Sequence, residues 1–539
     1  MSAEKYSNKI SKVRKKLRSY RADSVLQKVY DHLHWSGVNN PPALGMPWIV
    51  LFLLKLAMQE CRGDGKIITS AQFAALANEL FHMQGLAIPI GPGNPHLLLR
   101  PMILQQAWYQ GEVLTDVKAM TRQMAWYAQP GSPYDDKFTK TYGLTLEHFY
   151  LISLYLSIIV ANQAKGVAEI NLIDLLFRLT PSIPWESVVR YFLLISVRSQ
   201  DLPGFFLSHA VPGDLHQQSE FLQTTPLRHK PVLVDGDNFF ILNGKLFSRA
   251  IGTLMPALLK KMKGWSFKEY FGPDMEKYIG QLLIHSKITY LTENDLNGVC
   301  RRDSVVAGKM ADYMVPGSVN VIIESKAIEP GDIISAVFDP EILKAHLKDS
   351  FIKAIEQCQE SIFRLKRTKD YRDGSFACVV VTHEDFWFAS AVEVASYIDL
   401  DLAARIEAKF GKIPISMDKI LFVNIDMLES LFASHASGDV EIGQFIDECS
   451  AVLGTAEGRR FTMTHLIQDK LKGKLQGHEL LTSNADVWHE FFEKKLVENS
   501  SSWIGKHLEL MKNAAAAKQA IHRTLERLQN VDRGEVADR

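Results

Sequence analysis

The sequence has few cysteines and no excess of charge of either sign. Five of its 539 residues are cysteines, scattered without CxxC pairing (Cys61, Cys300, Cys358, Cys378 and Cys449). This pattern excludes a disulfide framework and a cysteine-rich structural zinc site, and it predicts free thiols in a reducing compartment. Lys plus Arg and Asp plus Glu both total 61, so no global charge attracts nucleic acid or a membrane surface. Any site for a polyanion has to be local.

The sequence also lacks long apolar runs, repeats and low-complexity tracts. Its longest apolar stretches, residues 48–54 and 149–161, are shorter than the ~20 residues that span a bilayer, and they predict buried core helices. No apolar segment follows the charges at the N-terminus, so we expect no secretory signal and a cytoplasmic protein. With 47% hydrophobic and 23% charged residues, the composition is that of a globular protein, and the length predicts several domains.

The helical and strand patterns predict a mixed α/β protein of three regions. Residues 1–225 show helical periodicity broken by Pro and Gly, and residues 428–539 are helical again. Between them, residues 226–427 contain a hairpin at 232–242 and then elements in the order α-βββ-α-β. The predicted core elements are a helix at 266–284, strands at 287–292, 309–315 and 319–327, a helix at 340–366, and strands at 376–382 and 419–425.

Residues 5–21 are strongly basic and contain no acid. Ile10, Val13 and Leu17 recur at helical spacing among the lysines and arginines, which predicts a basic amphipathic helix. We interpret it as a solvated helix face docked through its apolar stripe, and a phosphate-binding arm is the alternative.

The segment around residues 310–326 carries the chemistry. Two apolar strand patterns flank Pro316-Gly317-Ser318, so we expect a hairpin that brings Asp312 towards Glu324. Because side chains alternate along a strand, Glu324 and Lys326 should share one face. Two carboxylates suit Mg²⁺, whose bound water attacks a phosphodiester, and the Ser325 carbonyl is a further oxygen donor. A positioned lysine orients that water and stabilises the charge that develops on phosphorus.

An Asp followed by a turn and then Glu-x-Lys at the end of an apolar strand resembles the PD-(D/E)xK nuclease superfamily, although Ala311 stands where that motif has Pro. The predicted element order also resembles the restriction-endonuclease-like core of that superfamily. The resemblance implies that Asp312, Glu324 and Ser325 hold Mg²⁺, with Mn²⁺ as a substitute, and that Lys326 assists catalysis. It further implies that Glu276 in the leading helix completes the metal site and that Gln357 lies beside it.

The resemblance therefore implies a metal-dependent nuclease, with DNA favoured over RNA as substrate and a role in restriction or anti-phage defence by analogy. Basic residues near the expected site are candidates for phosphate contacts. These are Lys261, Lys263, Arg301, Arg302 and Lys309.

The helical regions then serve recognition or regulation, and a homodimer or a partner protein bound through them stays open. Two other functions also stay open: a non-catalytic scaffold with a nuclease-like core, and a nucleic-acid-binding regulator that uses the helix at residues 5–21. No Walker-type glycine loop, G-x-S-x-G elbow or HExxH helix is present. We interpret His383, which follows the strand at 376–382, as a structural histidine.

Overall fold

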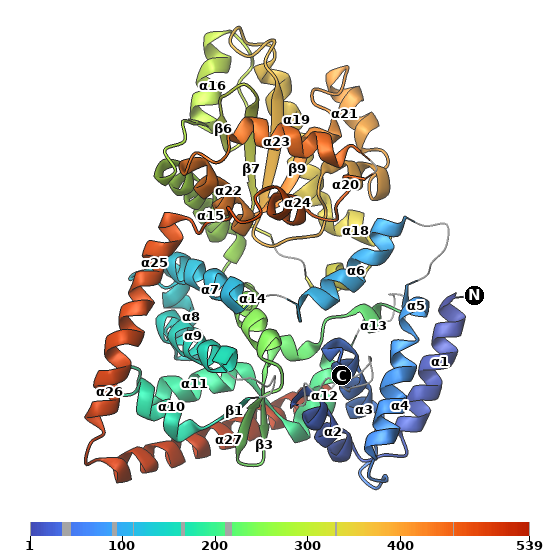
Figure 1. Cartoon of the computed structure of the whole chain (residues 1–539), viewed down its shortest axis with the longest axis vertical. Coiled ribbons are helices and arrows are strands. Elements are labelled where there is room, and N and C mark those ends of the chain that lie inside the picture. The colour runs from blue at the N-terminus through green and yellow to red at the C-terminus, as the bar shows by residue number, and fades with distance from the viewer. Residues whose placement is uncertain are drawn as a thin grey trace. The chain divides into compact units, whose positions relative to one another are not determined.

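The computed structural model describes residues 2–34, 45–88, 94–110, 113–162, 168–210, 218–328, 331–455 and 457–537. The chain forms two compact units (Figure 1). Unit 1 comprises Met1–Gly91, Met102–Gly264 and Asn484–Arg539, and unit 2 comprises Pro92–Pro101 and Trp265–Ser483. Each unit combines helices with one sheet, so the predicted mixed α/β class is confirmed.

Unit 1 is mainly helical, with a small sheet in the strand order β1-β4-β3-β2. Strands β3 and β4 form the predicted hairpin, whose turn contains Gly236 at φ 51°; this backbone conformation favours glycine. The elements of unit 1 are α1 Ser2–Leu17, α2 Ala22–His34, α3 Pro47–Glu60, α4 Ser70–Phe81, α5 Gln84–Ala87, α7 Val113–Tyr127, α8 Pro133–Tyr142, α9 Leu146–Asn162, β1 Ala168–Ile170, α10 Leu172–Leu179, α11 Trp185–Ile195, β2 Ser196–Arg198, α12 Leu202–Ser208, α13 Ser219–Leu222, β3 Val232–Asp235, β4 Asn238–Ile241, α14 Gly244–Lys261, α26 Leu496–Ser502 and α27 His507–Ala537.

The two apolar stretches form buried helices of unit 1, as predicted. Helix α3 buries nearly every residue from Ile49 to Met58, and α9 buries most of its apolar residues, including Phe149 and Leu156. Among the described residues, no single helix has the length and apolarity needed to cross a membrane. The bent pair Pro133–Tyr142 and Leu146–Ala161, at 81° to each other, meets both criteria only when the two helices are taken together.

The basic N-terminal segment forms helix α1. Tyr6, Ile10, Val13 and Leu17 are buried along one stripe of this helix, as the amphipathic pattern predicts. Arg14 is tied into unit 1 by ion pairs with Glu60 and Glu220, at 2.7 and 2.8 Å. The lysines on the opposite face are exposed, so the helix is docked through its apolar side.

Unit 2 is an α/β unit with a sheet in the order β5-β6-β7-β8-β9. The pairs β5–β6 and β6–β7 are antiparallel, whereas β7–β8 and β8–β9 are parallel. Its elements are α15 Phe267–His285, β5 Leu291–Thr292, α16 Glu293–Arg302, β6 Tyr313–Val315, β7 Asn320–Lys326, α17 Asp332–Ala336, α18 Pro340–Leu347, a π-helical turn Lys348–Ile352, α19 Lys353–Leu365, β8 Phe376–Thr382, α20 Ala391–Tyr397, α21 Leu402–Phe410, β9 Ile420–Asn424, α22 Ile425–Ala436, α23 Ile442–Leu453 and α24 Met463–Lys470; α6 Pro95–Ala107 begins in unit 2, and α25 Glu479–Glu490 ends in unit 1.

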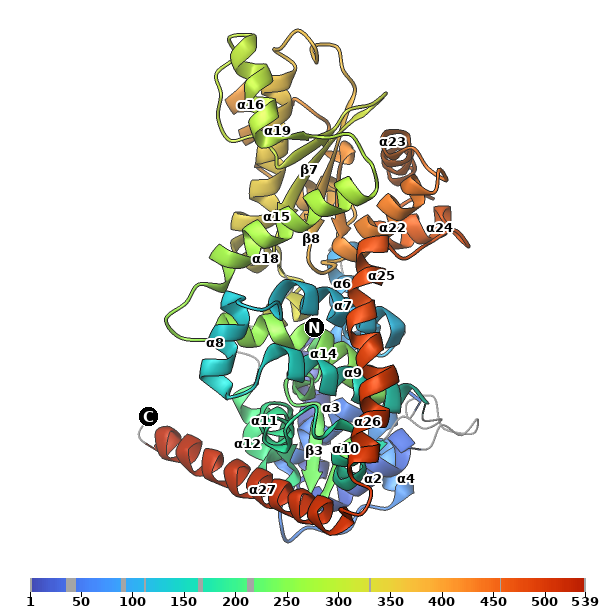
Figure 2. The same cartoon turned by 90° about the vertical axis from the view of Figure 1, so that its left-hand side faces the viewer.

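Helices cover both faces of the sheet in unit 2. Figure 2 shows β7 and β8 between α19 on one side and α22 with α23 on the other, and packing contacts join each of these helices to the sheet. The α19 side contains the main core cluster, to which alternate strand residues such as Ile322, Cys378 and Val380 contribute. This alternation follows from the two-residue period of a strand, and it fixes which side chains of β7 face α19.

The compact units have other boundaries than the predicted 225/226 and 427/428. The hairpin at 232–241 belongs to unit 1, because β4 pairs with β1 and β3 pairs with β2. Residues 428–483 belong to unit 2, because α22 and α23 cover its sheet. The C-terminal helices belong to unit 1, where Asn499 Nδ2 donates to the Leu179 carbonyl at 2.9 Å and Trp503 Nε1 donates to the Thr180 carbonyl at 3.1 Å. These are pairings between distant segments that local sequence patterns do not encode.

Helix α15 is fixed to the sheet by Tyr313, the first residue of β6. The Tyr313 hydroxyl donates to the Glu276 carbonyl at 3.0 Å. A Cβ at Gly280 would lie 2.7 Å from the hydroxyl oxygen of Tyr313. We therefore expect Gly280→Ala to lower the free energy of unfolding by about 1–3 kcal/mol, because the added methyl group displaces a buried ring. Chemical denaturation measures this.

Gly298→Ala is the matched control for this prediction. Gly298 lies inside α16 with open space where its Cβ would stand, so alanine should raise the free energy of unfolding by about 0.5–1 kcal/mol. Combining Gly280→Ala with Tyr313→Phe should recover part of the loss. Equal stability of the two alanine variants would contradict the close approach of α15 to Tyr313.

Candidate functional site

The pairing of β6 with β7 brings Asp312 next to Glu324, as predicted. Tyr313 is the register partner of Ile323, so the residue before Tyr313 stands opposite the residue after Ile323. The backbone N–H of Ser325 donates to Asp312 Oδ2 at 2.6 Å. Because the N–H and C=O of one strand residue point to the same side, the Ser325 carbonyl is directed to the Asp312 side of β7.

Glu324 and Lys326 lie on the face of β7 that packs against α19. Lys326 Nζ donates to Glu324 Oε1 at 2.5 Å and to Gln357 Oε1 at 2.8 Å. The side chain of Glu324 is 1% exposed and that of Lys326 is 15% exposed. The structure therefore brings together four of the predicted residues: Asp312, Glu324, Lys326 and, from α19, Gln357.

The Glu324 carboxylate is poorly compensated for a buried charge. Among the described residues, its Oε2 has no hydrogen-bond partner. Burial, followed by the negative charge of Asp312, raises the pKa of Glu324 to about 7, against the opposing effect of Lys326. A cation bound between Asp312 and Glu324 would satisfy this oxygen and remove the repulsion between the two carboxylates.

We expect this burial to make the metal-free protein less stable as the pH rises. The pKa of Glu324 is raised from 4.5 to about 7 in the folded state, so its stabilising contribution is complete below pH 4.5 and is lost as the pH rises through about 7. Glu324→Gln should therefore be more stable than the wild type at pH 8, by on the order of 3 kcal/mol, and nearly equal to it at pH 5. Chemical denaturation in EDTA at both pH values measures the difference.

Glu407→Gln is the control for this titration, because Glu407 is an exposed residue of α21. It reports the effect of exchanging a glutamate for glutamine at a position that is not buried. If Glu324→Gln differs from the wild type by the same amount at both pH values, Glu324 does not titrate in the expected range.

Glu276 lies on α15, and the charges of Asp312 and Lys326 act on its carboxylate. Burial, followed by the charges of Asp312 and Glu293, raises the pKa of Glu276, whereas Lys309 and Lys326 lower it. Glu293 was not among the predicted site residues. Its Oε1 accepts a hydrogen bond from the Met310 backbone N–H at 2.9 Å. The sequence signal that could have drawn attention to Glu293 was its position directly after Thr292, the N-cap of α16.

The carboxylates fit Mg²⁺ as a set of two. Within the part of the chain that the structure describes, no group of three or more His, Cys, Asp or Glu side chains is arranged to hold a metal ion. Mg²⁺ is commonly bound through one or two carboxylates with water in its other positions. Asp312, Glu324 and the Ser325 carbonyl supply such a donor set, while Glu276 is linked to it only through its charge.

The five basic residues predicted to bind nucleic acid are divided between the two compact units. Lys309 is exposed, three residues before Asp312, and Arg301 is exposed at the end of α16. Arg302 is engaged in ion pairs with Asp303 at 3.0 Å and Asp370 at 2.7 Å. Lys261 and Lys263 belong to unit 1, so they lie outside the unit that contains Asp312.

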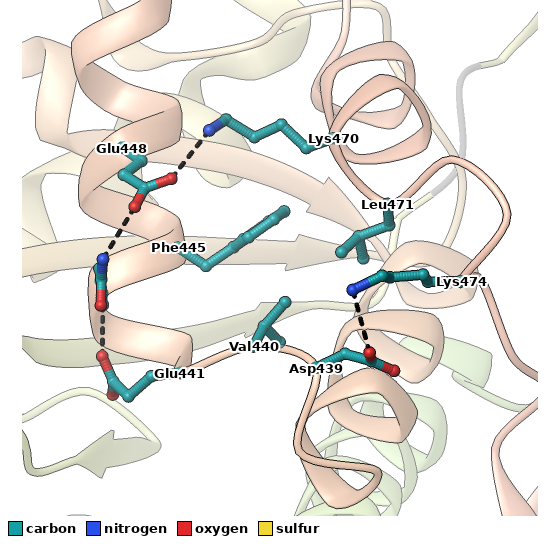
Figure 3. A pocket seen from close by; sticks show the side chains of 9 residues that line it. Asp439, Val440, Glu441, Phe445, Glu448, Lys470, Leu471 and Lys474 are labelled. Atoms are coloured by element: carbon teal, nitrogen blue, oxygen red, sulfur yellow. Dashed lines mark hydrogen bonds and ion pairs between the residues drawn. The ribbon is translucent and has the colours of Figure 1, made fainter.

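A pocket beside α23 and α24 is a poorer candidate. It has a volume of about 270 Å³ and is lined by residues of α23 and α24 and their flanking loops (Figure 3). Its two lysines are already paired, Lys470 with Glu448 at 2.9 Å and Lys474 with Asp439 at 3.2 Å, and Glu441 caps the start of α23. His383 directly follows the last residue of β8, Thr382. It is buried, and its ring meets that of Phe271 edge-on.

No family model, no curated protein and no solved structure matches this chain.

Proposed function

We propose that the chain is a metal-dependent nuclease that hydrolyses phosphodiester bonds, with a PD-(D/E)xK-like core in unit 2. The observation that carries the proposal is the convergence of Asp312, Glu324 and Lys326, in which a lysine bonds a buried carboxylate beside a second carboxylate. The order of elements supports it. Three antiparallel strands, β5 to β7, with α16 inserted between the first two, precede α17 to α19 and then β8, which is parallel to β7. Apart from the added helices, this order resembles the α-βββ-α-β pattern.

The side chains have distinct roles in this proposal. Asp312 and Glu324 hold the Mg²⁺ ion, which supplies a Lewis acid and a bound water when present. Ser325 fixes Asp312 through its backbone N–H, and Gln357 fixes the ammonium group of Lys326. Lys326 orients the water and stabilises the negative charge that develops on the phosphoryl oxygens. DNA is the favoured substrate, and a role in restriction or anti-phage defence follows from the resemblance alone.

The test is a cleavage assay on linear, circular and single-stranded DNA and on RNA. Wild type is compared with Asp312→Ala and Lys326→Ala, each with Mg²⁺, with Mn²⁺ and with EDTA. Cleavage that requires metal and is lost in both variants supports the proposal and identifies the substrate. Cleavage that persists in both variants overturns this assignment of the site.

A non-catalytic scaffold is the second candidate, and two observations favour it. Glu324 is already paired with Lys326, and the described residues provide no cluster of three potential ligands. Titration calorimetry with Mn²⁺ separates the two candidates when nothing is cut. Binding that requires Asp312 favours a nuclease that awaits a trigger, whereas absence of binding favours the scaffold.

A further inference from the structure

A second pocket of unit 2 lies on the same helix as Gln357. It has a volume of about 320 Å³. Its walls come from the loop after α16, from α19 with the turn that follows it, and from the end of α21. We call it the aromatic–arginine pocket, and the residues that define it are Val306, Glu360, Phe363, Arg364, Arg367 and Phe410.

The pocket offers flat apolar and cationic surfaces together. The rings of Phe363 and Phe410 are 4.7 Å apart, centroid to centroid. The guanidinium of Arg367 lies 3.8 Å above the centre of the Phe363 ring. Val306 beside them is 80% exposed, which is unusual for a large aliphatic side chain. Aromatic rings and planar guanidinium groups are the surfaces on which proteins stack nucleobases.

The charge of the pocket suits a phosphate. Its one carboxylate, Glu360, is compensated twice, by Arg364 at 2.5 Å and by Lys409 at 2.8 Å. Within the described residues, the Arg367 side chain makes no hydrogen bond or ion pair. It is exposed and is held only by its stacking on Phe363. The pocket thus carries a net positive charge, with one guanidinium available to an anion.

Two connections tie the pocket to the candidate site. The Ala311 backbone N–H, directly before Asp312, donates to Ser361 Oγ on α19 at 2.9 Å. Arg364 Nη1 donates to the Val306 carbonyl at 3.3 Å, in the loop that leads to Asp312. Along α19, Arg364 follows Gln357 by about 10 Å at 1.5 Å per residue, so both positions are within reach of neighbouring nucleotides on one strand.

We propose that the aromatic–arginine pocket binds an unpaired nucleobase and an adjacent phosphate of a single-stranded nucleic acid. Its link to cleavage rests on the proposed nuclease function, because the pocket would hold the nucleotides that flank the cleaved bond. A base pair inside a duplex has no free face to stack. The pocket volume is at the lower end of the range for ligand sites and suits one base rather than a folded partner.

The test is binding in EDTA, where cleavage does not interfere. Fluorescence anisotropy compares labelled oligothymidylate and oligouridylate with an abasic sugar–phosphate chain of equal length and with a duplex. Arg367→Ala and Phe363→Ala should each weaken binding of the two base-bearing single strands by about fivefold to a hundredfold. Phe363→Tyr should keep the affinity, because it keeps the ring. Arg62→Ala, which removes an exposed arginine of unit 1, is the charge-matched control.

Phe363→Ala should weaken binding of the abasic chain much less than it weakens binding of the base-bearing strands. The proposal is overturned if the wild type binds no single strand, if it binds the abasic chain as tightly as the base-bearing strands, or if Phe363→Ala binds like the wild type. The preference between the thymidylate and uridylate strands identifies the nucleic acid. Because no metal is present, failure of the pocket and failure of the nuclease proposal are separate results: base binding without cleavage removes only the latter.

Discussion

Lys326→Met is expected to lower kcat for phosphodiester cleavage by about a hundredfold to ten-thousandfold. Methionine keeps most of the apolar stem of the lysine but removes the ammonium group that contacts Glu324 and Gln357. The attacking water then loses its orienting group, and the phosphoryl charge loses a positioned cation. Single-turnover kinetics on the substrate found by the cleavage panel measures the chemical step directly.

Two further variants define what Lys326 contributes. Lys309→Met removes a nearby exposed lysine whose charge acts on Glu324 less than that of Lys326 does, and it should raise KM while leaving kcat within a few-fold. Lys326→Arg keeps a cation but changes its shape and proton affinity, so a partial rate would assign the effect to charge. If Lys326→Met retains the full single-turnover rate, Lys326 is outside the catalytic machinery.

Much of the candidate site could be predicted because strand geometry is periodic. The side-chain period of two places Glu324 and Lys326 on one face, and the Pro316-Gly317-Ser318 turn sets the register that brings Asp312 opposite Glu324. A shift of one residue would move every apolar residue of β7 to the other face of a buried sheet. Hydrophobic pattern and turn chemistry therefore specify the same pairing.

One helix of unit 2, α16, was not predicted, because its sequence signal is weaker than the alternation along β7. Helix α16 stands between β5 and β6, where only strands were predicted, although Thr292 and Asp295 form a capping box at its start. The residues that follow this helix line the pocket on α19. Strand β5 is also shorter than predicted, because it covers only Leu291–Thr292 of the expected 287–292. The observed α-β-α-β-β order thus inserts a helix into the expected run of three strands.

Contacts between residues far apart in the sequence could not be predicted from local sequence patterns. Arg100, which is fully buried, donates to the carbonyls of Phe386 and Ile334 at 2.7 and 2.8 Å. These bonds attach a short segment of the N-terminal region to unit 2 across more than two hundred residues. Burial of a guanidinium is costly where its donors are not satisfied, and Nη2 of Arg100 finds no hydrogen-bond partner among the described residues. The composition around Arg100 gives no indication of which distant carbonyls accept from Nε and Nη1.

Asp312→Asn is expected to weaken Mn²⁺ binding by more than the 10- to 100-fold that loss of an outer partner of a metal site typically costs, and to abolish cleavage. Asparagine keeps an oxygen that accepts from the Ser325 N–H, so the bond between β6 and β7 is retained. Alanine would leave that N–H without a partner at a cost of about 1–3 kcal/mol. Asp370→Asn, on an exposed residue paired with Arg302, is the matched control and should bind Mn²⁺ like the wild type in calorimetry.

The same substitution has a second readout that needs no metal. The charge of Asp312 is the second cause, after burial, of the raised pKa of Glu324. Removing that charge should lower the pKa of Glu324 below the wild-type value of about 7, while burial keeps it above 4.5. Carboxyl ¹³C NMR titration in EDTA follows this group directly. An unchanged Glu324 titration would contradict the close approach of the two carboxylates. A lowered pKa with undiminished Mn²⁺ affinity would leave the carboxylate pair in place but assign the metal to other ligands.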